Sequence, residues 1–113
     1  MKTTRQVKDL ETIKKYVNKY MKLDITTPIR QRSYVYGRAM YYQLSRSFTT
    51  HSLTDIGAVV NKDHASVLHG LKTFKNFRTW NEDYLLQIYH EIRIALKSEF
   101  LFANPYLTKT DEE

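Results

Sequence analysis

The arginines in the middle of the chain are the residues with the clearest capacity for chemistry. The stretch between Asp24 and Asp55 contains no acidic residue, but it contains four arginines, Arg30, Arg32, Arg38 and Arg46. Cations that gather without nearby carboxylates suit a surface that faces phosphate groups. A solvated basic face without a ligand is the alternative that composition alone leaves open.

A second group of functional side chains stands at positions 63–66. An aspartate such as Asp63 can accept a hydrogen bond from the amine of cytosine, and the methyl group of Ala65 can pack on that of thymine. The simpler interpretation makes Asp63 only a helix N-cap and His64 only a surface residue. Both interpretations place this tetrapeptide at the start of a helix.

The sequence contains no pattern that points to catalysis. Its four histidines form no HExxH arrangement, it has no cysteine, and no GxxxxGK[ST] loop could bind a nucleotide. We therefore expect a protein that is not an enzyme, with no catalytic residue, metal site, cofactor or nucleotide.

Five helices are expected to position these side chains. Apolar spacing and capping residues predict an all-α fold with helices over 7–21, 33–48, 52–60, 63–74 and 81–100. Asn81 is placed to cap the last helix, with Trp80 packing on Leu85. Pro28 disfavours helix at the preceding residue, so 24–32 is expected to be a loop whose arginines reach outward.

The segment 51–74 has the order of a helix-turn-helix, with a short helix, a tight turn at 61–62 and a second helix. A recognition helix needs an apolar back that seats it on the domain and a polar first turn that fits the major groove. Val67, Leu71 and Phe74 supply the back, and residues 63–66 supply the first turn.

This segment, together with the upstream run IRQRSYVYGRAMYYQLSRSFTT, resembles the C-terminal DNA-binding domain of the bacterial replication initiator DnaA. The most specific part is DHASVLH at 63–69, preceded by TTHSL at 49–53, and the match extends over about 10–77. The resemblance implies a Trp-repressor-like helix-turn-helix fold with an added long C-terminal helix. The initiator's ATPase domain has no counterpart in these 113 residues.

The resemblance also implies contacts with DNA, residue by residue. It implies that Arg30 enters the minor groove. It implies base reading in the major groove by Asp63, His64, Ala65, Leu53 and Thr54. It implies contacts with the DNA backbone by Arg32, Arg38, Thr49, Lys62, Ser66 and His69.

Three departures from the family pattern predict a DNA site that differs from the family's own. The turn at 61–62 is Asn-Lys where the family usually has a longer Gly-Gly-basic turn. Ala65 replaces a hydroxyl residue, and Thr54 stands where proline is usual.

Charge divides the chain into two parts. Residues 1–78 hold 15 Lys/Arg and 5 Asp/Glu, whereas 79–113 hold 3 and 7. We expect 1–78 to form the helix-turn-helix domain, with 79–113 a helix and acidic tail packed on the same single domain. No apolar run is long enough for a membrane span and no secretory signal is evident, so a cytoplasmic protein of a bacterium, phage or mobile element is expected.

The expected function is sequence-specific binding of double-stranded DNA, in replication or regulation, through the helix that starts at Asp63 and the loop 30–32. Double-stranded DNA is the expected partner, with a replication protein or a second copy as possible additional partners. One alternative is an adaptor of the replication machinery that docks through the last helix and acidic tail. Another is a single-stranded nucleic-acid binder that stacks bases on tyrosines, namely Tyr34, Tyr36, Tyr41 and Tyr42.

Overall fold

The computed structural model describes residues 7–79 and 83–103, and these residues form helices without any strand. The five helices are α1 (Lys8–Met21), α2 (Arg32–Phe48), α3 (Leu53–Ala58), α4 (His64–Thr79) and α5 (Asp83–Ala103). The predicted all-α fold is confirmed. None of the described helices combines the length and apolar character that a membrane crossing requires.

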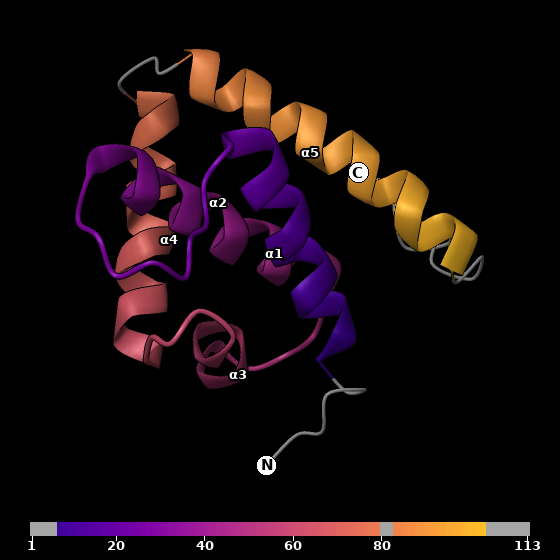
Figure 1. Ribbon diagram of the computed structural model, residues 1–113, viewed down its shortest axis with the longest axis horizontal. Helices are drawn as coiled ribbons and strands as arrows, with labels where there is room; N and C mark the ends of the chain where they lie inside the picture. Colours follow the sequence, from indigo (N-terminus) through magenta and orange to yellow (C-terminus); the bar gives the residue numbers. More distant parts are fainter. Residues whose placement is uncertain (1–6, 80–82, 104–113) are drawn as a thin grey trace.

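Helix α2 is the centre around which the other helices pack. Figure 1 shows α4 on one side of α2 and α1 on the other, and both helices contact it. Ala39, Met40, Tyr41 and Leu44 of α2 are fully buried between them. The helix continues through Gly37, where a Cβ atom would lie 2.9 Å from Cγ2 of Ile25 in the preceding loop. The glycine therefore lets that loop approach α2 closely.

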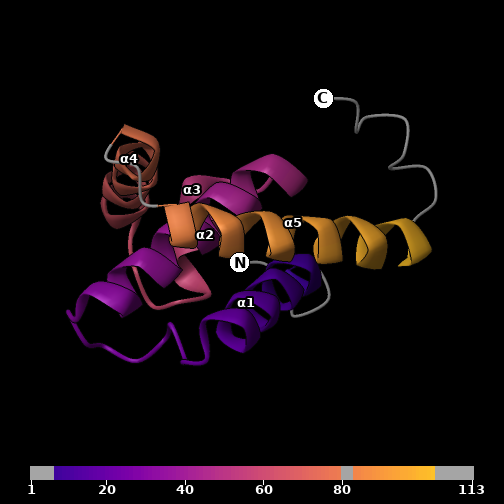
Figure 2. The same cartoon turned by 90° about the horizontal axis from the view of Figure 1, so that it is seen from above.

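Helix α5 lies across α1 and the end of α4 (Figures 1 and 2). Leu85, Tyr89, Ile92 and Leu96 of this helix are buried, and Ile88 is partly buried. The Tyr89 ring packs on Phe74 of α4 with centroids 4.6 Å apart. At the other end of α5, the Tyr16 hydroxyl of α1 donates to Glu99 Oε1 at 2.8 Å.

The expected packing of Trp80, the Asn81 cap and the acidic tail over 104–113 fall outside the residues that the structure describes.

Candidate nucleic-acid interface

Hydrogen bonds fix the N-terminal end of the short helix α3. Ser52 caps it, with Oγ accepting the Asp55 N–H at 3.1 Å. Just before it, His51 Nε2 lies 2.9 Å from Asp9 Oδ1, which ties this connection to α1. Helix α3 therefore starts at the predicted place and is anchored to the rest of the fold.

The turn between α3 and α4 depends on a left-handed residue at Asn61, with φ 61°. The Asn61 N–H donates to Ala58 O at 3.1 Å and the Lys62 N–H donates to Gly57 O at 2.9 Å, which closes a Schellman motif. Asparagine tolerates this conformation better than most residues with a side chain. The predicted tight turn at 61–62 is confirmed, and an asparagine occupies its left-handed position.

Gly57 allows α3 to approach α4 closely after this turn. A Cβ atom at Gly57 would lie 2.6 Å from the backbone oxygen of Lys62 and 3.0 Å from Cγ2 of Val67. Any larger residue would push the two helices of the motif apart.

The first turn of α4 projects from the molecule. Asp63, His64 and Ala65 are exposed, and Ser66 is partly exposed. Asp63 Oδ1 accepts the Ser66 N–H at 2.9 Å, so Asp63 is the N-cap of α4. Hydrogen bonds from Ser66 hold the pKa of the Asp63 carboxyl below its usual value of 3.8. The capping role is thus present, and it leaves the turn accessible to a ligand.

The opposite face of α4 seats the helix on α2. Val67 and Phe74 are buried as predicted, and Leu71 is partly buried. Gly70 lies directly against the Tyr42 ring, so that a Cβ atom would overlap it. This close approach sets how the recognition helix crosses α2.

Arg38 is placed differently from a residue that contacts phosphate. Its side chain is 7% exposed, and its guanidinium donates to three carbonyl oxygens of the α1–α2 loop. Nη1 lies 3.0 Å from the oxygens of Ile25 and Thr27, and Nη2 lies 2.8 Å from that of Ile29. The expected contact of Arg38 with the DNA backbone stays a prediction, whereas the structure shows that its guanidinium faces inward and holds the loop.

The loop that Arg38 holds also carries Arg30, which is exposed. Further hydrogen bonds order it, since the Ile25 N–H donates to Asn18 Oδ1 at 2.9 Å and the Thr26 N–H to Asp24 Oδ1 at 3.0 Å. The sequence predicted a loop whose arginines reach outward, and Arg30 does so from a backbone that is held at several points.

Arg30 and the first turn of α4 line one hollow of about 650 Å³, which we call the Arg30 hollow. It gathers seven of the twelve residues for which DNA contacts are predicted, namely Arg30, Arg38, Lys62, Asp63, Ala65, Ser66 and His69. Arg38 lines this hollow as a buried side chain, whereas Arg30, Asp63 and Ala65 are exposed. The α1–α2 loop and the first turn of α4 therefore lie next to each other in space. The sequence alone could not predict their relative position.

The remaining predicted contact residues lie outside this hollow. Three of them are exposed, namely Arg32 at the start of α2, Thr54 of α3 and His64 at the start of α4. Leu53 is partly buried. The Thr49 hydroxyl donates to Ser45 O at 2.7 Å.

The tyrosines of α2 serve packing rather than an exposed stacking platform. Tyr41 and Tyr42 are buried, and the Tyr41 hydroxyl donates to Ile56 O at 2.8 Å. Tyr36 is partly buried, and its ring meets Phe77 edge to face with centroids 4.9 Å apart. The single-stranded alternative therefore loses its main support.

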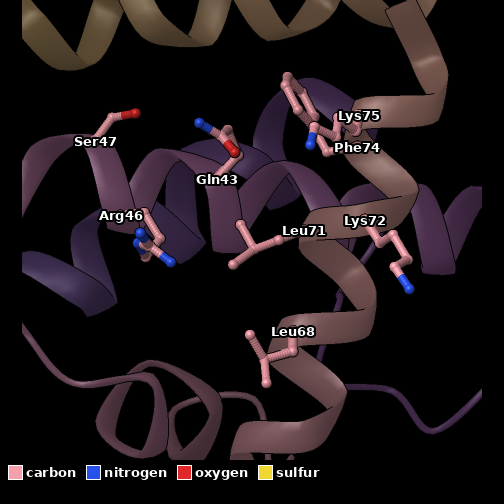
Figure 3. A pocket seen from close by; sticks show the side chains of 8 residues that line it. All are labelled: Gln43, Arg46, Ser47, Leu68, Leu71, Lys72, Phe74 and Lys75. Atoms are coloured by element: carbon pink, nitrogen blue, oxygen red, sulfur yellow. The ribbon is translucent and has the colours of Figure 1, made fainter. Parts of the chain in front are cut away.

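A second basic depression, of about 590 Å³, lies on the other flank of α4, and we call it the Arg46 groove. Figure 3 shows its lining by α2 and α4, namely Gln43, Arg46, Ser47, Leu68, Leu71, Lys72, Phe74 and Lys75. Among these, the sequence drew attention to Arg46 alone as a cation. The spacing of Leu68, Lys72 and Lys75 along one helix face was the signal that could have revealed it.

Within 7–79 and 83–103, no group of three or more histidine or acidic side chains is arranged to hold a metal ion.

Comparisons with known proteins place this arrangement in a family. Residues 10–73 match a family model described as the bacterial dnaA protein helix-turn-helix. The chain is 30% identical over 88 residues to the chromosomal replication initiator protein DnaA of Flavobacterium psychrophilum. It is 33% identical over 94 residues to the protein of the same name from Bacteroides thetaiotaomicron.

These relatives are much longer than the matched segment. The two alignments cover 74% and 80% of this chain but 18% and 20% of the relatives, so the chain spans about a fifth of their length. No solved structure matches the chain. The family model nevertheless covers more than half of the 113 residues, from α1 through most of α4. The chain therefore belongs to the family of the bacterial DnaA helix-turn-helix, as its residues at 49–53 and 63–69 predicted.

Proposed function

We propose that this protein binds double-stranded DNA in a sequence-specific manner, without catalysis of its own. The first turn of α4 enters the major groove, where Asp63, His64 and Ala65 read base edges, with Leu53 and Thr54 beside them. Family membership supports DNA binding and a relation to replication. The observation that carries the proposal is the Arg30 hollow, because it joins the exposed first turn of α4 to an exposed arginine.

The loop around Arg30 supplies the second part of the interface. Arg30 enters the minor groove next to the major-groove site, and Arg32 contacts the DNA backbone. Thr49, Lys62, Ser66 and His69 contact phosphates as well. Phosphate contacts of this kind fix orientation, whereas the first turn of α4 specifies sequence. Such a protein works in the cytoplasm at the nucleoid, and it either marks a replication site or regulates a promoter.

Selection of duplexes from a random pool, followed by electrophoretic mobility shifts, tests this function. We expect an enriched motif and tighter binding to it than to a scrambled duplex. If Lys and Arg side chains neutralise about five phosphates, the logarithm of the binding constant should fall against the logarithm of salt concentration with a slope of about −4 to −5. Equal affinity for every sequence at all salt concentrations would contradict the proposal.

A pair of histidine variants makes the test specific for the first turn of α4. His64→Ala should reduce discrimination between selected and scrambled duplexes by about 1–3 kcal/mol, the typical value of a good base contact. His90→Ala is the matched control, because His90 is also exposed but lies on α5. Loss of discrimination in both variants, or in neither, would argue against base reading by His64.

A docking role for α5 is the second candidate, and its outer face supports it. Tyr84 and Ile94 are 63% and 67% exposed on that helix. Replacing Arg30 and His64 together separates the two functions, because a protein that acts only as an adaptor keeps its biological activity without DNA contacts.

A further inference from the structure

The Arg46 groove has the composition of a phosphate-binding surface. Arg46 and Lys75 supply positive charge, and Gln43 and Ser47 supply neutral hydrogen-bond donors (Figure 3). None of the described residues that line the groove carries a carboxylate. Among the ion pairs of the described residues, none involves Arg46 or Lys75. Their charges are therefore available to an anionic partner.

The position of the groove relates it to the proposed DNA interface. Ser66, His69 and Thr73 of α4 line the Arg30 hollow, whereas Leu68, Leu71 and Lys75 line the Arg46 groove. Each set follows helical spacing of three or four residues, so the two depressions lie on opposite flanks of one helix. Each depression also contains cations, Arg30 and Lys62 on one flank and Arg46 and Lys75 on the other. The exposed edge of α4 separates the two depressions.

The dimensions of DNA then suggest what fills the groove. An α-helix with its side chains is about 10–12 Å across, and the major groove of B-DNA is about 12 Å wide. A helix that enters the major groove of DNA therefore has one sugar-phosphate strand on each side. If the Arg30 hollow faces one strand, the Arg46 groove must face the other.

We propose that the Arg46 groove binds the backbone of the DNA strand that lies on the opposite side of α4 from Arg30. This rests on the proposed function. Arg46 and Lys75 contact phosphates, and Leu68, which is 52% exposed, packs on deoxyribose or a base edge at the entrance. Lys72 is not assigned to this strand, because its side chain leads away from Arg46 (Figure 3).

Salt dependence of DNA binding tests this assignment. The double variant Arg46→Gln/Lys75→Gln should reduce the steepness of the salt slope by about 2, since each phosphate contact contributes about 0.9. It should weaken binding to selected and scrambled duplexes by the same factor. Lys15→Gln/Lys19→Gln removes the same charge from exposed positions on α1, and it should leave the slope close to the wild-type value. Arg46→Lys/Lys75→Arg, which keeps the charge, should restore the slope.

Ethylation interference shows which DNA strand each of these side chains contacts. Ethylated phosphates that weaken binding of the wild-type protein should lose their effect on one strand in the Arg46/Lys75 variant. They should lose it on the other strand in Lys62→Gln, because Lys62 lines the Arg30 hollow and is proposed to contact a phosphate. An unchanged salt slope, or loss on the same strand in both variants, would overturn the assignment while leaving DNA binding intact. Binding of an acidic peptide by the wild-type protein that the variant loses, without a change in the salt slope, would also overturn the assignment, because it would mean that the groove serves a protein partner. Failure of the wild-type protein to bind any duplex would overturn the proposed function itself.

Discussion

Asp63 combines two roles that a single substitution can separate. Its Oδ1 atom caps α4 by accepting the Ser66 N–H, and in the proposed interface the same carboxylate accepts from a base. An asparagine retains an oxygen for the cap but loses the charge, whereas an alanine loses both. The capping interpretation and the base-reading interpretation that the sequence left open are therefore compatible, and they can be measured independently.

We expect Asp63→Asn to lower the thermal midpoint less than Asp63→Ala does, because asparagine keeps the capping oxygen. The selected DNA motif should shift at one position toward adenine, which asparagine prefers. Asp63→Ala should lower the thermal midpoint. Because the pKa of Asp63 is lowered in the folded state, its stabilising effect is present above the ordinary value of 3.8 and is lost as the pH falls through the lower folded-state pKa. Calorimetry from neutral to acidic pH checks this. An unaltered motif in both variants would leave Asp63 with the cap alone.

The α1–α2 loop is the element whose role depends most on one buried side chain. Arg38 holds the oxygens of Ile25, Thr27 and Ile29, and Arg30 follows directly after the last of them. Three donors fixed in a planar group position the loop in a way that the single ammonium of lysine cannot reproduce. Arg38 therefore positions the loop that carries Arg30.

A double-mutant cycle tests that role. Arg38→Lys should weaken DNA binding in the wild-type background but have little further effect once Arg30→Ala is present. We expect an interaction energy within the range of about 0.5–3 kcal/mol that coupled residues show. Affinity is measured at a temperature where all four proteins are folded, as verified by circular dichroism. If the two losses add to within about 0.5 kcal/mol, Arg38 acts independently of Arg30.

The helices and the turn were accessible from the sequence because their causes are local. Apolar spacing located α2 to within one residue of its start at Arg32, and Asp63 marked the beginning of α4. The partner of Arg38 was not accessible, since its carbonyl acceptors lie 9 to 13 residues earlier in the chain. Their meeting depends on how the loop folds back onto α2.

The same limit explains why the Arg46 groove was missed. Arg46 and Lys75 are far apart in sequence, and they become neighbours because α4 crosses α2 where Gly70 meets Tyr42. Sequence patterns describe each helix face separately. The angle between two helices follows from such contacts, which no single-helix pattern contains.

At the scale of the whole molecule, the question is whether α5 belongs to the same folding unit as the helix-turn-helix. It contacts α4 through Tyr89, which packs on Phe74, and α1 through Glu99, which accepts a hydrogen bond from Tyr16. These contacts favour a single cooperative unit over a separate appendage. In that case α5 stabilises the seat of α4, although it lies away from the proposed DNA surface.

Two isoleucines on α5 provide a matched test of this coupling. Ile92 is fully buried and Ile94 is 67% exposed, so the same substitution can be made inside and outside the core of one helix. Ile92→Ala should lower the free energy of unfolding by about 2–5 kcal/mol, whereas Ile94→Ala should change it by less than about 0.5 kcal/mol. Native-state hydrogen exchange should then show faster exchange for the most protected amides of α4 as well as α5 in Ile92→Ala. If only the α5 amides respond, α5 unfolds on its own, and the helix-turn-helix owes its stability to α1–α4 alone.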